Sequence, residues 1–187
     1  NCVAFLHTAA TGALGTTSTG YSTSAATMLT NLRGAAGGAP RLAAYWRDMN
    51  YTAANSGAVF CNATIPNKFV ITWRNGVHFG QTSPVFTVQM QVFADGHVEY
   101  FYGLGANNTA ACPMVGVSQG GGIADPGISD LSVGVSGVST TPIVYQSFPT
   151  LNSFDLATTN VSFFPNAAGG YDHVPSACVP ANTTSYG

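Results

Sequence analysis

The sequence predicts an all-β fold, a two-sheet antiparallel β-sandwich of jelly-roll type with at most one short helix. Many short apolar segments are separated by turns rich in Gly and Pro, and one segment alternates cleanly between apolar and polar residues. Helical periodicity is confined to residues 24–33. This pattern is typical of sandwiches and barrels. No linker or internal repeat divides the chain, so we expect residues 1–187 to form one domain.

The strongest element is a β-hairpin around the turn pair Asp95-Gly96. Apolar residues alternate with Thr and Gln over 85–93, and a second apolar segment covers 97–102. A two-residue loop would place Glu99 opposite Val92 on the apolar face, whereas a three-residue loop keeps that face apolar. We therefore predict the three-residue loop, with Gly96 at positive φ. The predicted pairs are Val92 with Val98, Met90 with Tyr100, Val88 with Tyr102 and Gln91 with Glu99.

The other elements are expected to be short. A helix is predicted over 24–33, where Gly34 ends it. The turn pair Asn75-Gly76 is predicted to close the strand over 69–73. The remaining strands are predicted over 42–46, 58–61, 114–118, 131–138, 142–148 and 161–164.

The composition indicates a secreted protein whose binding to partners is not driven by electrostatic attraction. Charged residues make up 6% of the chain and the net charge is −2, which leaves no basic surface for nucleic acid. No apolar run reaches the about 18 residues of a membrane span, so we expect no membrane insertion. The N-terminus has no leader pattern, and we expect any signal peptide to have been removed. Low charge favours association with other extracellular proteins, with copies of itself, or with glycans.

Four cysteines and five sequons point to an oxidising compartment. The cysteines are widely spaced, without a C-x-x-C pair or a Cys/His cluster, so two disulfides fit better than a zinc site. Of the three possible pairings we predict Cys61–Cys112, which flank the central strands, and Cys2–Cys178, which lie near the two termini. The candidate glycosylation sites are Asn50, Asn62, Asn107, Asn160 and Asn182.

Residues 41–103 carry an ordered set of features. Trp46-Arg47-Asp48 ends a short apolar strand, and residues 69–73 read Phe-Val-Ile-Thr-Trp. Phe-Thr-Val-Gln at 86–89 and Glu-Tyr-Phe-Tyr at 99–102 follow in the hairpin. This order resembles the nidogen-like extracellular domain and its relatives in large secreted bacterial surface proteins. The resemblance implies a non-enzymatic extracellular β-sandwich used in adhesion or matrix assembly. Met49 replaces the usual second acidic residue after Trp-x-Asp, which weakens the case for a metal or acidic ligand site carried over from the family.

One motif suggests catalysis. Residues 116–120 read Gly-Val-Ser-Gln-Gly, the pattern of a nucleophile elbow, as in secreted cutinase-like esterases. The chain order also supplies a triad of Ser118, Asp155 and His173, with Asp172 as a second acid. An elbow must lead into a helix, whereas here the motif leads into three glycines and then Pro126. A strand that ends in a Gly-rich turn is therefore the preferred interpretation.

Other chemistry has less support. A glycosidase needs two carboxylates, and the single glutamate, Glu99, has only Asp48 as a conceivable partner. The histidines show no metal-ligand spacing, and we expect no cofactor. Calcium is a minor alternative at two loops that Asx turns explain more simply, with candidate ligands Asp48, Asn50, Asp125 and Asp130. Lys68, the single lysine, is expected to guard a strand end rather than to form an isopeptide bond.

Aromatic residues outside the alternating core pattern are candidates for a binding surface. They are Tyr45, Phe79 and Phe101. We expect a non-enzymatic extracellular module for adhesion, matrix contact or assembly into a cell-surface structure. A carbohydrate-binding, lectin-like domain is the alternative, and a secreted serine esterase comes third.

Overall fold

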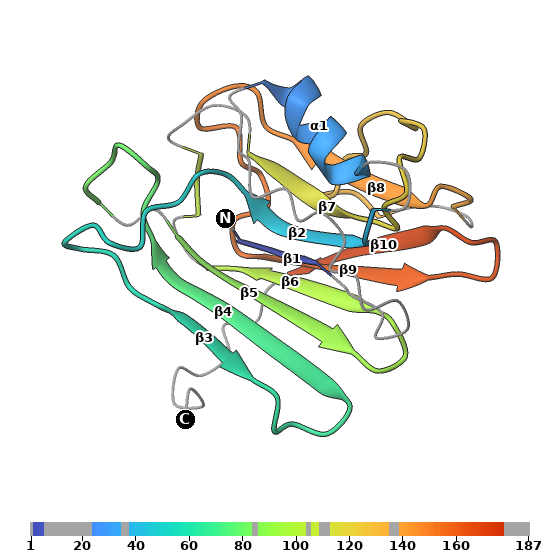
Figure 1. Cartoon of the computed structure of the whole chain (residues 1–187), viewed down its shortest axis with the longest axis horizontal. Helices are drawn as coiled ribbons and strands as arrows, with labels where there is room; N and C mark the ends of the chain where they lie inside the picture. Colours follow the sequence, from blue (N-terminus) through green and yellow to red (C-terminus); the bar gives the residue numbers. More distant parts are fainter. Residues whose placement is uncertain are drawn as a thin grey trace.

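The computed structural model describes residues 2–5, 24–34, 38–83, 86–103, 106–108, 113–134 and 139–177. These residues form two antiparallel sheets packed face to face, with one short helix (Figure 1). The predicted two-sheet β-sandwich is therefore confirmed.

The two sheets differ in width. The smaller sheet has the strand order β1-β2-β7-β8. Its strands are β1 (Cys2–Phe5), β2 (Arg41–Trp46), β7 (Met114–Ser118) and β8 (Ile143–Ser147). The larger sheet has the order β10-β9-β6-β5-β4-β3. Its strands are β3 (Val59–Asn62), β4 (Lys68–Gly76), β5 (Phe86–Phe93), β6 (Val98–Tyr102), β9 (Thr159–Pro165) and β10 (Tyr171–Ala177).

The β5–β6 hairpin has the predicted register. Val92 pairs with Val98, Met90 with Tyr100, Val88 with Tyr102 and Gln91 with Glu99. The amide of Gly96 donates to the carbonyl of Phe93 at 3.0 Å, which closes the three-residue loop, and Gly96 has a φ of 91°. The apolar residues of both strands therefore share the face that packs on the smaller sheet.

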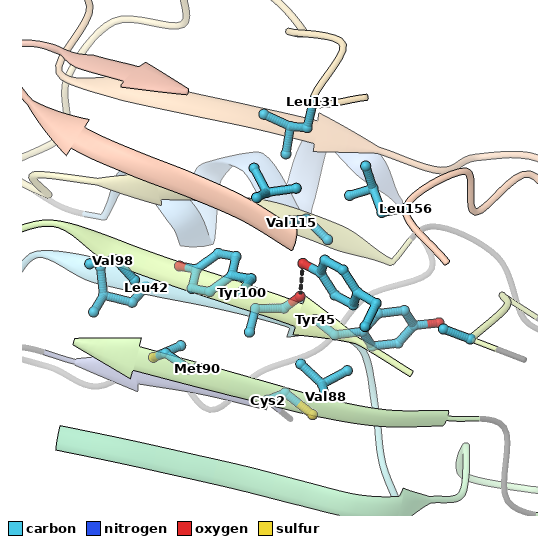
Figure 2. Close-up of a cluster of buried hydrophobic side chains, with 14 of the residues drawn as sticks. Cys2, Leu42, Tyr45, Val88, Met90, Val98, Tyr100, Val115, Leu131 and Leu156 are labelled. Atoms are coloured by element: carbon cyan, nitrogen blue, oxygen red, sulfur yellow. Dashed lines mark hydrogen bonds between the residues drawn. The ribbon is translucent and has the colours of Figure 1, made fainter. Parts of the chain in front are cut away.

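The main core lies between the two sheets (Figure 2). Val88, Met90, Val98 and Tyr100 come from the larger sheet, while Leu42, Tyr45, Val115 and Val117 come from the smaller sheet. Since burial contributes about 25 cal/mol per Å² of apolar surface, this layer is the main source of stability.

A second, smaller core lies between the smaller sheet and the helix α1 (Ala25–Arg33), which packs on β2 and β7. Met28 and Leu32, one helical turn apart, contact this core together with Trp46. The helix begins at Ser24, whose hydroxyl caps the amide of Thr27, and Gly34 ends it as predicted. As a result β2 is buried on both faces.

Two local predictions are wrong. Asn75-Gly76 does not close a strand, because β4 continues through both residues with a bulge at which Asn75 has a φ of 51°. Residues 131–134 form a turn and not a strand, since Asp130 accepts from the amide of Ser132 at 3.0 Å and reverses the chain. Residues 135–138 of that predicted strand lie outside the described residues. The strands β1 and β10 are additional to those predicted.

Candidate functional site

The larger sheet extends beyond the smaller one at its β3 end, where Figure 1 shows β3 well away from the smaller sheet. Large apolar side chains are exposed on and beside this strand: Val59 (46%), Phe60 (49%), Ile65 (38%) and Phe69 (38%). The thiol-bearing Cys61 is exposed as well. We call these five residues the β3 edge surface.

The register of β3 on β4 divides this surface between the two faces of the sheet. Val59 pairs with Trp73 and Cys61 with Ile71. Because Trp73 belongs to the main core and Ile71 packs against it, Val59 and Cys61 lie on the inner face, beyond the reach of the smaller sheet. Phe60 lies on the outer face, where the guanidinium of Arg74 is 5.3 Å from the ring centroid.

Lys68 stands beside this surface, at the first residue of β4. Its ammonium group donates to Oε1 of Gln91 at 2.9 Å and lies 5.3 Å from the ring centroid of Phe93. This is the strand-end position predicted for the lysine. Its hydrogen bond leads away from β3, so β3 itself carries no charged side chain.

The opposite edge of the larger sheet is protected. The outward amide of Tyr171 in β10 donates to the carbonyl of Thr141 at 3.2 Å. Alternate residues of a strand direct their peptide groups to the same side, so the nitrogen of Pro175 also points outward, and it has no N–H. Proline and a covering loop are common devices against unwanted strand pairing. The two edges of the sheet are therefore not equivalent.

The structure does not bring together the triad of the esterase alternative. The hydroxyl of Ser118, at the end of β7, accepts from the amide of Gly120 at 3.0 Å. Nε2 of His173 lies 3.1 Å from the carbonyl oxygen of Asp130, and Asp155 accepts from Nε2 of Gln146 at 3.2 Å. The second candidate acid, Asp172, accepts from the amide of Ser139 at 2.7 Å. A Gly-rich turn follows Ser118 in place of a helix, as the preferred interpretation predicts.

Three of the four candidate calcium ligands form Asx turns. Asn50 accepts from the amide of Thr52 at 2.9 Å, Asp125 from Gly127 at 2.9 Å and Asp130 from Ser132 at 3.0 Å. Asp48 accepts through its backbone carbonyl, from the amide of Phe79 at 3.1 Å. Among the described residues, no group of three or more His, Cys, Asp or Glu is arranged to hold a metal ion.

The predicted aromatic surface does not form. Tyr45 is fully buried in the main core, and its neighbour Trp46 is buried under α1. The prediction for Tyr45 is wrong because β2 is covered on both faces, so alternation along the strand does not tell an inner residue from an exposed one. Phe79 is exposed in a loop, whereas Phe101 is half-buried on the outer face of β6.

Among the described residues, Cys2 is buried in β1 and Cys61 is exposed in β3, and the two are not bonded to each other. Cys112 and Cys178 lie outside the described residues, so both disulfides stay predictions. The reason given for pairing Cys61 with Cys112 does not hold, however. β3 belongs to the larger sheet, whereas the strand that follows Cys112, β7, belongs to the smaller sheet, so the two cysteines do not flank the strands of a single sheet.

The sequons differ in their surroundings. Asn50 and Asn62 lie in Asx turns, where Oδ1 of Asn62 accepts from both the amide and the hydroxyl of Thr64 at 2.8 Å. The side-chain amide of Asn107 donates to Asn152 at 2.8 Å. Asn160 lies within the inner strand β9, and its Oδ1 is buried. Asn182 lies outside the described residues.

Sequence reasoning missed the β3 edge surface. The sequence over 59–61 has the composition of any short buried strand, because no local pattern indicates that a strand lies at the edge of a sheet. One signal was available: each face of this four-residue strand carries a large apolar residue, Val59 or Phe60, and the strand has no charge or proline to protect an edge.

Within the described part of the chain, the arrangement defines a β-sandwich module with one protected and one open sheet edge. A family model described as NIDO related matches residues 8–171. Because the match covers most of the chain, the protein belongs to this nidogen-related family, which confirms the resemblance over residues 41–103. The family indicates an extracellular module. Comparison with curated proteins found no match, and comparison with solved structures found none either. The described part of the chain contains no helix long and apolar enough to cross a membrane.

Proposed function

We propose that this nidogen-related domain is a non-enzymatic module for adhesion, matrix contact or assembly, and that it contacts another protein through the β3 edge surface. The observation that carries the proposal is the exposure of four large apolar side chains around an open strand edge. Soluble proteins normally protect such edges, and apolar patches that stay exposed mark interaction sites. Addition of a strand to an open sheet edge is a recurring mode of protein recognition.

Retention of the domain on the cells and matrix of its own source tests this proposal. Val59→Lys places a charge at the edge of the sheet, where the exposed side chain leaves room for it. Val174→Lys is the matched control, since Val174 is equally exposed (48%) but lies on the protected strand β10. We expect Val59→Lys to abolish retention and Val174→Lys to preserve it. Equal retention of the two variants would contradict the proposal.

We also propose that the protein is secreted with two disulfides and with glycans at Asn50 and Asn62. Asn50 lies in a turn, and Asn62 is the last residue of β3 with its side chain in an Asx turn, so a bulky group is accommodated at both, whereas Asn160 lies between two paired strands. Peptide mapping without reduction tests the disulfides. Enzymatic removal of N-glycans from the native protein, followed by mass measurement of the peptides, tests the glycans. Modification at Asn160 with none at Asn62 would contradict this assignment.

A further inference from the structure

We propose that two copies of this chain pair through β3, antiparallel across a two-fold axis, with Phe60 opposite Phe60 of the second copy. The proposal rests on the proposed function and names its partner as a second copy of the chain. The two larger sheets then join into one continuous antiparallel sheet. The same patch is used on both copies, which is the usual arrangement in two-fold dimers.

The hydrogen bonds of β3 show which of its peptide groups are unpaired. The amide of Arg74 in β4 donates to the carbonyl of Ala58 at 3.0 Å. Residues in step with Ala58, the even-numbered ones, therefore direct their peptide groups to β4. Alternate residues face the other way, so the N–H and C=O groups of Val59 and Cys61 face the open edge.

One register uses the whole strand in such a pairing. Val59 lies opposite Cys61 of the second copy, Cys61 opposite its Val59, and Phe60 lies on the axis. The outward peptide groups of Val59 and Cys61 then find partners on the second copy. A register shifted by two residues would place Val59 opposite Val59, or Cys61 opposite Cys61, of the second copy. The other of these two residues would then lie opposite a position outside β3.

The side chains on both faces suit this register. On the inner face Val59 meets Cys61 of the second copy, beside the exposed Phe69 of each chain. On the outer face the two Phe60 rings meet, and aromatic cross-strand pairs stabilise antiparallel sheets. β3 carries no charge, so no like charges oppose each other across the axis. The cation nearest to β3 on the outer face, Arg74, already lies over the ring of its own Phe60.

The protected edge argues against a head-to-tail chain of copies. Such a chain would join β3 of one copy to β10 of the next. The outward amide of Tyr171 is already bonded to Thr141, and Pro175 has no N–H to offer. β3 therefore fits a second β3 better than it fits β10, and the assembly closes as a dimer.

The area of the contact makes it a weak one. An aromatic side chain buries about 150–250 Å², so the exposed parts of Phe60 and Phe69 offer roughly 150–200 Å² per copy. With Val59, Cys61 and Ile65 added, the total stays below the about 1,200 Å² of a standard interface. Pairing of this kind gains strength where many copies are held on one surface.

Disulfide trapping tests the register, because a disulfide needs Cα atoms about 4.4–6.8 Å apart. In a Cys61→Ser background of the full chain, we place the probe thiol with Phe60→Cys, Asn62→Cys or Val174→Cys. Position 60 faces itself on the axis. Position 62 faces Ala58 of the second copy, so its two thiols are about four residues apart along the strand, roughly 13 Å. Circular dichroism confirms that the variants are folded.

We expect mild oxidation to give a reducible dimer with Phe60→Cys at least about tenfold faster than with Asn62→Cys or Val174→Cys, since only position 60 meets the distance limit. The double variant Ala58→Cys/Asn62→Cys is expected to form the dimer as well. In the natural chain after reduction, the two Cys61 residues lie diagonally, about 7–8 Å apart, and are expected to crosslink more slowly than Phe60→Cys.

Equal rates at the three positions, or no dimer with Phe60→Cys, would overturn the pairing. If no dimer forms but Val59→Lys still abolishes retention on cells and matrix, self-pairing is wrong and the proposed function stands. If Val59→Lys retains its binding too, both proposals are wrong. Trapping with Val174→Cys alone would assign self-association to β10 instead.

Discussion

The hydroxyl of Tyr102 in β6 donates a hydrogen bond of 2.7 Å to the carbonyl of Ala44 in β2, directly across the core. Ala44 lies at a bulge of β2 and has no register partner in β1 or in β7. Tyr100 makes a similar bond to the carbonyl of Gly116 at 3.0 Å. Two tyrosines of one strand therefore connect the larger sheet to the backbone of the smaller sheet.

We expect Tyr102→Phe to lower the free energy of unfolding by about 1–2 kcal/mol, because the ring remains while a buried carbonyl loses its donor. Urea unfolding measures this as a lower midpoint with an unchanged slope. Tyr145→Phe is the control, since its hydroxyl bonds to the exposed Asp125 at 2.9 Å, where water can replace the lost donor. A loss in Tyr145→Phe as large as in Tyr102→Phe would contradict the assigned role.

The hairpin turn depends on Gly96. Its φ of 91° is one that an alanine adopts only with strain. We expect Gly96→Ala to lower the free energy of unfolding by about 1 kcal/mol. In Gly134→Ala the added methyl meets only Cδ of Pro175 at an ordinary 3.6 Å, and we expect almost no change. Thermal unfolding of the two variants measures the difference in their midpoint temperatures. Equal midpoints would contradict the role assigned to Gly96 in the turn.

His78 makes the fold sensitive to acid. It is fully buried, with Nε2 2.9 Å from the hydroxyl of Tyr45. Burial, with Arg47 as a second cause, lowers the pKa of His78 from 6.5 to about 4. The unfolded chain therefore takes up a proton below pH 6.5, whereas the folded chain does so only near pH 4. The contribution of neutral His78 to the free energy of unfolding is complete above pH 6.5. It is lost as the pH falls toward 4, and the loss is at most about 3 kcal/mol.

Urea unfolding at a series of pH values measures this loss. We expect His78→Asn to be less stable at neutral pH and to show a smaller decline between pH 6.5 and 4. His97→Asn is the control, because His97 bonds to the exposed Asp95 at 2.7 Å on the outer face. A decline in His78→Asn as steep as in the natural chain would show that other groups cause it.

Local signals were sufficient for the hairpin and the helix. In the hairpin, alternation, an Asp-Gly turn and the cost of burying Glu99 select one register, and each of these signals lies within about twenty residues. Ser24 and Gly34 delimit α1 in the same way. By contrast β10 contains Asp172, His173 and Pro175, which are poor strand formers, and only its pairing with β9 makes it a strand.

The candidate site depends on how the strands and the helix are arranged in the fold, which no local sequence pattern predicts. Tyr45 and Trp46 are adjacent and both apolar, and only the position of α1 decides which of them faces the main core. Val59 and Phe60 form a site because the larger sheet is wider than the smaller one. No periodicity reports the relative width of two sheets, so the exposed edge emerges only from the fold.

The two described thiols are expected to differ sharply in reactivity. Cys2 is fully buried, and burial raises the pKa of its thiol to about 12. Only about one Cys2 in ten thousand is then a thiolate at pH 8, and the thiolate is the reactive form. Cys61 is exposed on β3 and is open to reagent.

After reduction and removal of the reductant, we expect iodoacetamide to modify Cys61 at least about 100-fold faster than Cys2. Peptide mass spectrometry after timed quenching reads both positions, and concentrated guanidinium chloride should abolish the difference because unfolding exposes both thiols. Equal rates in the folded protein would mean that β1 opens readily or does not pair with β2 as described.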